Sequence, residues 1–337
     1  MKKYLLSIFA VCVSISLFAQ EAEKPSPWKC TGVVGLNASA NGLVNWSAGG
    51  NNNINGVAFG KVRLLYAEDN LSWETNLNLE YGLSYIDQKF DPFQKSSDVI
   101  DFKTKFGWQF HKAWYLTVSG GFKSQFDLGR AYDGSEAEDP VVSSFLSPSY
   151  TDISVGIDWK PNSIFSIYVS PVAGQITTAF VGDKLNEKYE GLRQQMQDKY
   201  ATWSYSEEAN ADGTYDKIYK NFKAELGLTV KGAINYTYKD LKIITSVGLF
   251  TPYAWDKTEM FDAEGNFVGY RDNNRRFGNF DVDWDAAISY QFLKCLNVTL
   301  STSLKYYNGV KVANADGVLA ERVQFKSVLG LGVGYSF

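Results

Sequence analysis

The stretch "LSWETNLNLEYGLSY", residues 71–85, alternates without interruption between two kinds of side chain. Its odd positions are large and apolar, apart from Thr75, and its even positions are polar or glycine. Successive side chains of a β-strand point to opposite faces of the sheet, so the pattern predicts a strand with one apolar and one hydrated face. The run is fifteen residues long, whereas a strand of a soluble protein usually has about five or six.

The same alternation recurs along the chain and predicts twelve strands. They cover residues 28–39, 57–66, 71–85, 100–110, 114–127, 150–159, 164–175, 222–238, 241–249, 280–292, 296–307 and 323–337. Proline cannot donate a hydrogen bond to a neighbouring strand, so we expect a bulge or a strand end at Pro171.

The connections between these strands alternate in length. Tight turns are predicted at 67–70, 111–113, 160–162, 239–240 and 293–296, and longer connections near 45–54, 86–98, 128–149, 180–220, 254–276 and 308–320. Short turns at one end and long loops at the other are typical of bacterial outer-membrane barrels. We therefore predict an all-β fold, a closed antiparallel transmembrane β-barrel of about twelve strands with short periplasmic turns and long extracellular loops.

Alternation by itself leaves a soluble β-sandwich open as the alternative. The aromatic residues argue for lipid, because they gather beside the tight turns while Leu, Val, Ile and Ala occupy mid-strand positions of the same face. The aromatic set is Tyr66, Trp73, Trp108, Phe110, Trp114, Trp159, Phe165, Tyr236, Tyr238, Tyr290 and Phe292. Trp and Tyr are enriched at the depth of the lipid headgroups, and a sandwich core has no reason for such sorting.

Both ends of the chain carry signals of export and assembly. "MKKYLLSIFAVCVSISLFAQ" has a charged start, an apolar core and a small residue before Gln20, which predicts a signal peptide over residues 1–19 and a single barrel domain over 20–337. The chain closes on the amphipathic stretch "SVLGLGVGYSF". Its aromatic residues Tyr335 and Phe337 resemble the assembly signal that the barrel-assembly machinery reads in Gram-negative bacteria.

Composition excludes several classes of protein. The formal net charge of the whole chain is −4; removal of 1–19 takes away two Lys and no acid, which leaves 31 basic against 37 acidic residues. This balance gives no reason to expect a nucleic-acid partner. Cys30 and Cys295 are expected to be independent thiols, and with His111 as the single histidine we expect no metal site and no cofactor.

Charged residues on the hydrated strand faces are candidates for lining the lumen. They are Glu74, Glu80, Asp101, Lys103, Lys105, Lys123, Glu225, Lys231, Asp281, Asp283, Asp285 and Lys305. "DVDWDAAISYQF" (281–292) starts like a calcium loop, but Ala286 and Phe292 stand where Gly and Glu are required. Its three acids are expected to be neutralised by lysines of other strands, namely Lys223, Lys231, Lys242 and Lys305; a cation-selective or ligand-coordinating ladder is the alternative.

Two of the long connections have their own patterns. Within the extracellular loop 180–220, apolar residues recur at helical spacing between Leu185 and Trp203, which predicts a short amphipathic helix packed on the barrel mouth. The stretch "YRDNNRR" (270–276) is basic, and we expect a solvated loop there, with binding of lipopolysaccharide phosphates as the alternative.

Three segments resemble a family of Bacteroidetes barrel proteins that is catalogued as a domain of unknown function. They are the "LFAQ" cleavage region, "NGLVNWSAGGNNNINGVAF" (41–59) and "LSPSYTDISVGIDWKPN" (146–162). The resemblance runs over most of the mature chain and implies a barrel fold, but it brings no activity and no site residues.

We therefore expect an integral protein of the Gram-negative outer membrane that forms a narrow pore or transporter for small polar solutes. The alternative is a barrel without transport that displays extracellular loops for adhesion, assembly or partner binding. An enzyme is the least expected, and no catalytic residue is assigned, because His111 falls in a predicted turn. Expected partners are outer-membrane lipid, lipopolysaccharide and the barrel-assembly machinery; the oligomeric state stays open.

Overall fold

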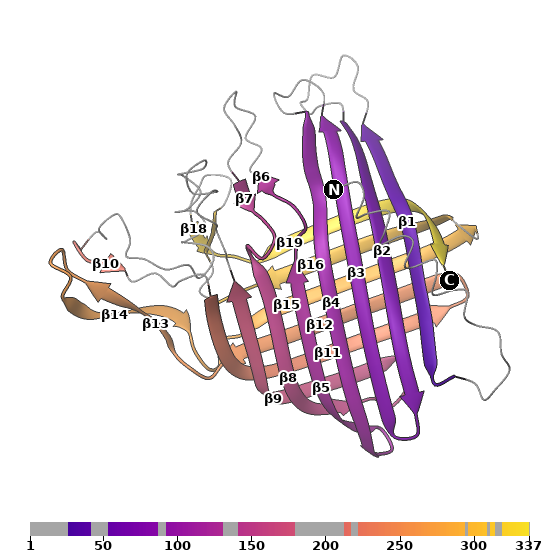
Figure 1. The fold of residues 1–337 in the computed structure, drawn as a ribbon, viewed down its shortest axis with the longest axis horizontal. Coiled ribbons are helices and arrows are strands. Elements are labelled where there is room, and N and C mark those ends of the chain that lie inside the picture. The colour runs from indigo at the N-terminus through magenta and orange to yellow at the C-terminus, as the bar shows by residue number, and fades with distance from the viewer. Residues whose placement is uncertain are drawn as a thin grey trace.

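Twelve long antiparallel strands close into one barrel in the computed structural model (Figure 1). It describes residues 26–41, 53–86, 92–130, 141–178, 212–216, 222–293, 296–308, 311–313 and 319–336. The barrel strands are β1 Trp28–Asn41, β2 Asn53–Glu68, β3 Leu71–Ile86, β4 Phe93–His111, β5 Trp114–Ser124, β8 Ser149–Trp159, β9 Phe165–Thr178, β11 Phe222–Tyr238, β12 Leu241–Pro252, β15 Asp281–Leu293, β16 Leu296–Tyr306 and β19 Gln324–Ser336. The predicted fold class and the twelve predicted strands are confirmed.

The first and last strands complete the ring. β1 pairs with β19 from Val33 opposite Ser336 to Asn37 opposite Gly332, and each other barrel strand pairs with its neighbours in the sequence of strands. Every barrel strand therefore has a hydrogen-bonded neighbour on both sides. An open sheet edge, with its row of unpaired backbone groups, is avoided.

The two ends of the barrel differ, and we call them the short-turn end and the long-loop end. At the short-turn end β2 and β3 are joined by residues 69–70, β4 and β5 by 112–113, and β11 and β12 by 239–240. Asp69 and Lys239, the first residues of two of these turns, have φ of 49° and 51°, because a two-residue hairpin needs a left-handed backbone conformation.

The long-loop end carries short sheets that the sequence did not predict. They are β6 Gly129–Arg130 with β7 Val141–Ser143, β17 Lys311–Ala313 with β18 Leu319–Glu321, and β10 Tyr215–Asp216 with the hairpin of β13 Asp256–Phe261 and β14 Phe267–Arg275. The long connection predicted near 254–276 does join β12 to β15, but it contains the β13–β14 hairpin. The connection predicted near 86–98 is shorter than expected, because β4 already begins at Phe93. Hydrogen bonding between neighbouring strands simply continues beyond the alternating segments. The helix predicted between Leu185 and Trp203 lies outside the described residues.

The irregularity predicted at Pro171 is a bulge, and β9 continues through it. The register shifts against both neighbours at this point, between Val155 and Ile157 of β8 and between Gly227 and Thr229 of β11. Gly156 lies opposite the bulge, and a Cβ atom there would be 2.6 Å from the Cα of Ser170. Only glycine permits this approach of the two backbones.

Compared with a soluble protein, the barrel has the reverse distribution of side chains, with polar residues inside and apolar residues outside. Among the described residues the buried hydrophobic set is Tyr168, Ala173 and Phe250, whereas buried polar side chains are more numerous and include Asp158, Thr229 and Thr251. On the outer face, by contrast, Leu329, Leu331 and Val333 of β19 are 73%, 55% and 53% exposed. A soluble sandwich hides its apolar face in a core, so this surface needs an apolar environment.

Aromatic side chains ring the short-turn end, as predicted. Trp28 contacts Tyr66 and Trp73 with ring centroids 5.1 and 5.8 Å apart, and Trp159 contacts Trp114 and Phe165 at 6.1 and 5.8 Å. These rings lie on the outer face of neighbouring strands and form a band at one level. Such bands occupy the headgroup region of membrane barrels. Among the described residues there is no helix long and apolar enough to cross a bilayer.

The proposed export and assembly signals are only partly within the described chain. Residues 1–19 and Phe337 lie outside the described residues. The backbone of Tyr335 pairs with Val34 of β1, so the predicted assembly signal belongs to the strand that closes the ring.

The outer face of β3 provides a test of the lipid-facing assignment. Leu77 lies near the middle of β3 between Val62 and Phe102, and we expect Leu77→Arg to lower the free energy of unfolding by about 2–4 kcal/mol, the loss for a charge near the bilayer midplane. Urea unfolding in lipid vesicles measures it. The control is Asn78→Arg, which places the same charge on the inner face opposite Asp101; equal losses for both variants would contradict the assignment.

Candidate functional site

The predicted lumen residues lie on the inner face of the barrel, where most of them form ion pairs with one another or with charged residues of nearby strands. Asp101 pairs with Lys103 at 3.1 Å, and Lys231 of β11 pairs with Asp152 of β8 at 3.2 Å. The second pair reaches across β9, so these side chains extend around the wall and not only along it.

A compact cluster fills part of the lumen near the short-turn end. The carboxylate of Asp158 is completely buried, and its Oδ2 lies 2.5 Å from Lys105 Nζ and 3.2 Å from Lys160 Nζ. The ammonium of Lys105 also stacks over the Tyr168 ring at 5.0 Å, and the Tyr168 hydroxyl donates to Ser154. Two cations therefore share one carboxylate, and the cluster has a surplus of positive charge.

Two glutamates of β3 face basic residues of β2. The Nε of Arg63 donates to Glu74 at 2.9 Å, and Lys61 lies 3.8 Å from Glu80. Lys61 and Arg63 occupy the hydrated face of β2, as Glu74 and Glu80 occupy that of β3. The alternation within residues 57–66 would therefore have been enough to identify both basic residues as lumen candidates.

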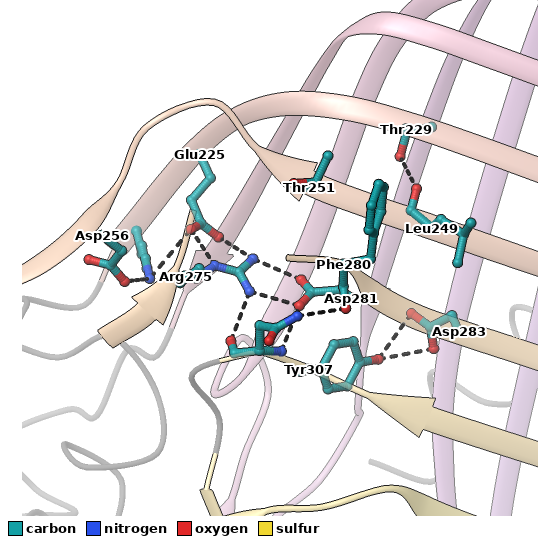
Figure 2. A network of polar contacts seen from close by, with 12 residues as sticks. Glu225, Thr229, Leu249, Thr251, Asp256, Arg275, Phe280, Asp281, Asp283 and Tyr307 are labelled. Atoms are coloured by element: carbon teal, nitrogen blue, oxygen red, sulfur yellow. Dashed lines mark hydrogen bonds and ion pairs between the residues drawn. The ribbon is translucent and has the colours of Figure 1, made fainter. Parts of the chain in front are cut away.

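A second cluster, which we call the latch, joins the β13–β14 hairpin to the barrel rim at the long-loop end (Figure 2). Arg275, the last residue of β14, lies between two carboxylates. Its Nε and Nη2 donate to Glu225 of β11 at 2.6 and 2.8 Å, and its Nη1 and Nη2 donate to Asp281 of β15 at 2.8 Å each. Nη1 also donates to the backbone carbonyl of Asn308 at 3.0 Å. All five N–H donors of the guanidinium are thereby used.

The latch is strongly coupled electrostatically. The side chains of Arg275, Glu225 and Asp281 are 8%, 15% and 9% exposed. Burial alone would lower the pKa of Arg275, but the hydrogen bonds and charges of the two carboxylates outweigh burial and raise it. The guanidinium is therefore always charged, and it supplies the shortest charged contacts of two buried acids.

Next to the latch, Asp283 accepts hydrogen bonds from Lys305 of the adjacent strand β16 and from Tyr307, which follows that strand; Figure 2 shows the contact with Tyr307. Its Oδ1 lies 2.8 Å from Lys305 Nζ, and the Tyr307 hydroxyl lies 3.0 Å from both carboxylate oxygens. Asp281 and Asp283 are thus both neutralised by basic side chains. In the part of the chain that the structure describes, no ion pair forms at Asp285 or at Lys123.

The sequence also left out, or paired differently, other groups of the site. The stretch 270–276 was expected to be a solvated loop, and this is wrong for Arg275, which is buried because the hairpin folds its end onto two inner-face acids. Asp152 and Asp158 of β8 were not selected either, although both stand on the hydrated face of that strand. Lys223 was expected to pair with the acids of 281–285, but it contacts Asp256 at 2.7 Å and Glu225 at 3.5 Å.

The described residues offer little for metal or nucleophilic chemistry. Across the described ranges no three His, Cys, Asp or Glu side chains lie close enough together to hold a metal ion. His111 is the exposed last residue of β4, at the short-turn end, and Cys30 is an exposed free thiol. Cys295 lies outside the described residues.

The comparisons with known proteins place this chain near a family of unknown function. The model of a family described as "Protein of unknown function (DUF3078)" matches residues 38–129, which span the end of β1 through β5. The resemblance expected from the sequence is supported to this extent. No curated protein matches the chain.

Several solved structures are similar in fold. An outer membrane channel from Pseudomonas putida F1 aligns with 11% identity and a TM-score of 0.37 over 95% of this chain and 98% of its own. The translocator domain of the autotransporter NalP from Neisseria meningitidis aligns with 10% identity and a TM-score of 0.35 over 100% and 96%. OmpT, an outer membrane protein of Vibrio cholerae, aligns with 9% identity and a TM-score of 0.29 over 94% and 100%. At this level of similarity, the barrel assignment rests on the strand pairing of the chain itself.

The latch predicts a large difference between two adjacent arginines. Arg275→Met leaves Asp281 buried without a cation and leaves Glu225 with only the longer contact to Lys223 at 3.5 Å. We expect a loss of about 3–5 kcal/mol of unfolding free energy, as for other broken buried ion pairs. Arg276→Met removes a half-exposed pair with Asp272 at 3.8 Å and a contact with the exposed Trp255 ring at 5.5 Å, for which we expect together no more than about 1–2 kcal/mol. Denaturant unfolding measures both variants, and a similar loss for the two would show that the latch is not structural.

Proposed function

We propose that this protein is an integral outer-membrane barrel that acts as a narrow pore or transporter for small polar solutes. The barrel supplies both surfaces that such a role requires. Its outer wall is apolar and bounded by aromatic rings, and its inner wall carries charged and hydroxyl side chains. An eight-stranded barrel is filled by its own side chains and sixteen strands leave an open channel, so twelve strands suit a restricted lumen.

The observation that carries this proposal is the exposure of charged side chains inside the barrel. Lys103 is 57% exposed, and the paired side chains of Lys231 and Asp152 are 43% and 39% exposed. These groups lie on the inner face, so the space they contact is inside the wall. A tightly filled barrel interior would bury them.

The orientation follows from the lengths of the connections. Barrels of this membrane have short turns on the periplasmic side and longer loops outside the cell, so we assign the short-turn end to the periplasm and the latch to the extracellular mouth. Outer-membrane lipid and lipopolysaccharide would contact the outer wall. The barrel-assembly machinery would engage β19, the strand that closes the ring.

Conductance across planar bilayers tests the pore directly with two neighbouring residues of β5. Ser119 lies on the inner face opposite Lys105, and Val118 on the outer face is 46% exposed. We expect Ser119→Trp to reduce single-channel conductance to less than about half, because an indole ring fills much of a narrow lumen, and Val118→Trp to leave it unchanged. Absence of any conductance in the unsubstituted protein would contradict the proposal.

A second function is favoured by the β13–β14 hairpin, which projects from the barrel at the left of Figure 1. Its exposed side chains include Trp255 just before β13 and Phe267 and Tyr270 on β14, at 48%, 52% and 58% exposure. Exposed aromatic residues are enriched at binding surfaces. A display function predicts that cells carrying the barrel without residues 257–270 lose adhesion or partner binding; conductance with unchanged adhesion would instead support the pore.

A further inference from the structure

One lysine of the lumen is left without a counterion. Lys123, near the long-loop end of β5, lies on the inner face between Asp101 of β4 and Tyr150 of β8. Within the described residues its ammonium makes no hydrogen bond or ion pair, although the side chain is half-buried. A buried or half-buried charge normally has a partner.

The acids that could neutralise Lys123 are already held by other cations. Asp101 pairs with Lys103 at 3.1 Å on one side, and Asp152 pairs with Lys231 at 3.2 Å on the other. Across the lumen, Asp283 is occupied by Lys305 at 2.8 Å and by the Tyr307 hydroxyl at 3.0 Å. Asp101 and Asp283 still attract Lys123 electrostatically, but each is already paired with another lysine. The three ammonium groups of Lys103, Lys123 and Lys305 therefore face two carboxylates, and one positive charge remains.

The lysines of the two facing walls are close enough to act on one another. β16 stands on the opposite side of the ring from β5, yet Lys305 interacts electrostatically with Lys123, as Lys103 does from the neighbouring strand. Lys103 on the neighbouring strand β4 and Lys305 on the facing strand β16 therefore both act on Lys123 inside the lumen. Nearer the short-turn end, Lys105 and Lys160 share the single carboxylate of Asp158. This cluster is a second part of the lumen with surplus positive charge.

We propose that Lys103, Lys123 and Lys305 form a binding site for small anions inside the lumen, and that the solutes of the barrel are anionic. The inference deepens the proposed pore function and rests on it for transport. A small carboxylate or phosphate between the three ammonium groups supplies the counterion that Lys123 lacks. The carboxylate of Asp285 interacts with Lys305 and reduces the positive charge of the site. Removal of this carboxylate should therefore have the opposite effect to removal of a lysine.

The first experiment measures the reversal potential of the reconstituted full-length protein across a KCl gradient. We expect a chloride preference in the unsubstituted protein. Lys123→Glu should lower the chloride-to-potassium permeability ratio by more than about threefold, because it changes the charge by two units and one unit charge acting over about 6 Å through water is worth about threefold. Lys123→Arg should keep the ratio, and Asp285→Asn should raise it. Lys112→Glu is the matched control, since Lys112 lies exposed in the turn after β4, and it should change nothing.

The second experiment reports on the site without any conduction. The folded protein in detergent is treated with an amine-acetylating reagent, and modification of Lys123 is followed by mass spectrometry with and without inorganic phosphate. We expect phosphate to protect Lys123 and not Lys112. Protection without conductance would uphold the anion site and overturn the pore; potassium preference, or a Lys123→Glu variant with an unchanged ratio, would overturn the anion site, as would the absence of protection.

Discussion

The backbone of every spanning strand has to find its hydrogen bonds inside the protein, because hydrocarbon offers none. The pairing of β1 with β19 meets this condition for the whole ring. Once the sheet is closed, successive side chains of each strand point alternately to the outside of the barrel and into its lumen. The apolar outer face, with its aromatic band, and the charged inner face are consequences of the same period of two.

Inside the ring, acids and lysines pair along and around the wall, and the charges do not form a single patch. Asp158, Asp152, Asp101 and Asp283 each hold at least one lysine, and these pairs fix long side chains that would otherwise move through the lumen. The pairing is unequal, since Asp158 holds two lysines and Lys123 has no partner in the described chain. On the proposed pore function, this surplus of positive charge favours small anionic solutes over large or apolar ones.

At the long-loop end a different principle applies. Arg275 is buried between Glu225 and Asp281 because its planar guanidinium can donate to two carboxylates at once, which a lysine could not do with the same geometry. The hairpin that carries it is thereby fixed to the rim of β11 and β15 (Figure 2). The position of the exposed aromatic residues of this hairpin therefore depends on these three side chains.

Period-two alternation in stretches such as 71–85 determined the strands and their number, because strand geometry converts spacing along the chain directly into faces of a sheet. The lengths of the connections determined the two ends of the barrel, and the missing N–H of Pro171 determined the bulge. Candidate lumen residues such as Asp283 and Lys305 followed from the same rule. Which of them meet was decided by closure, which brings β5 opposite β16 and Lys231 to Asp152 across β9. The tertiary structure also decided that Arg275 is buried between two acids, since a basic stretch is solvated unless the fold places acids around it.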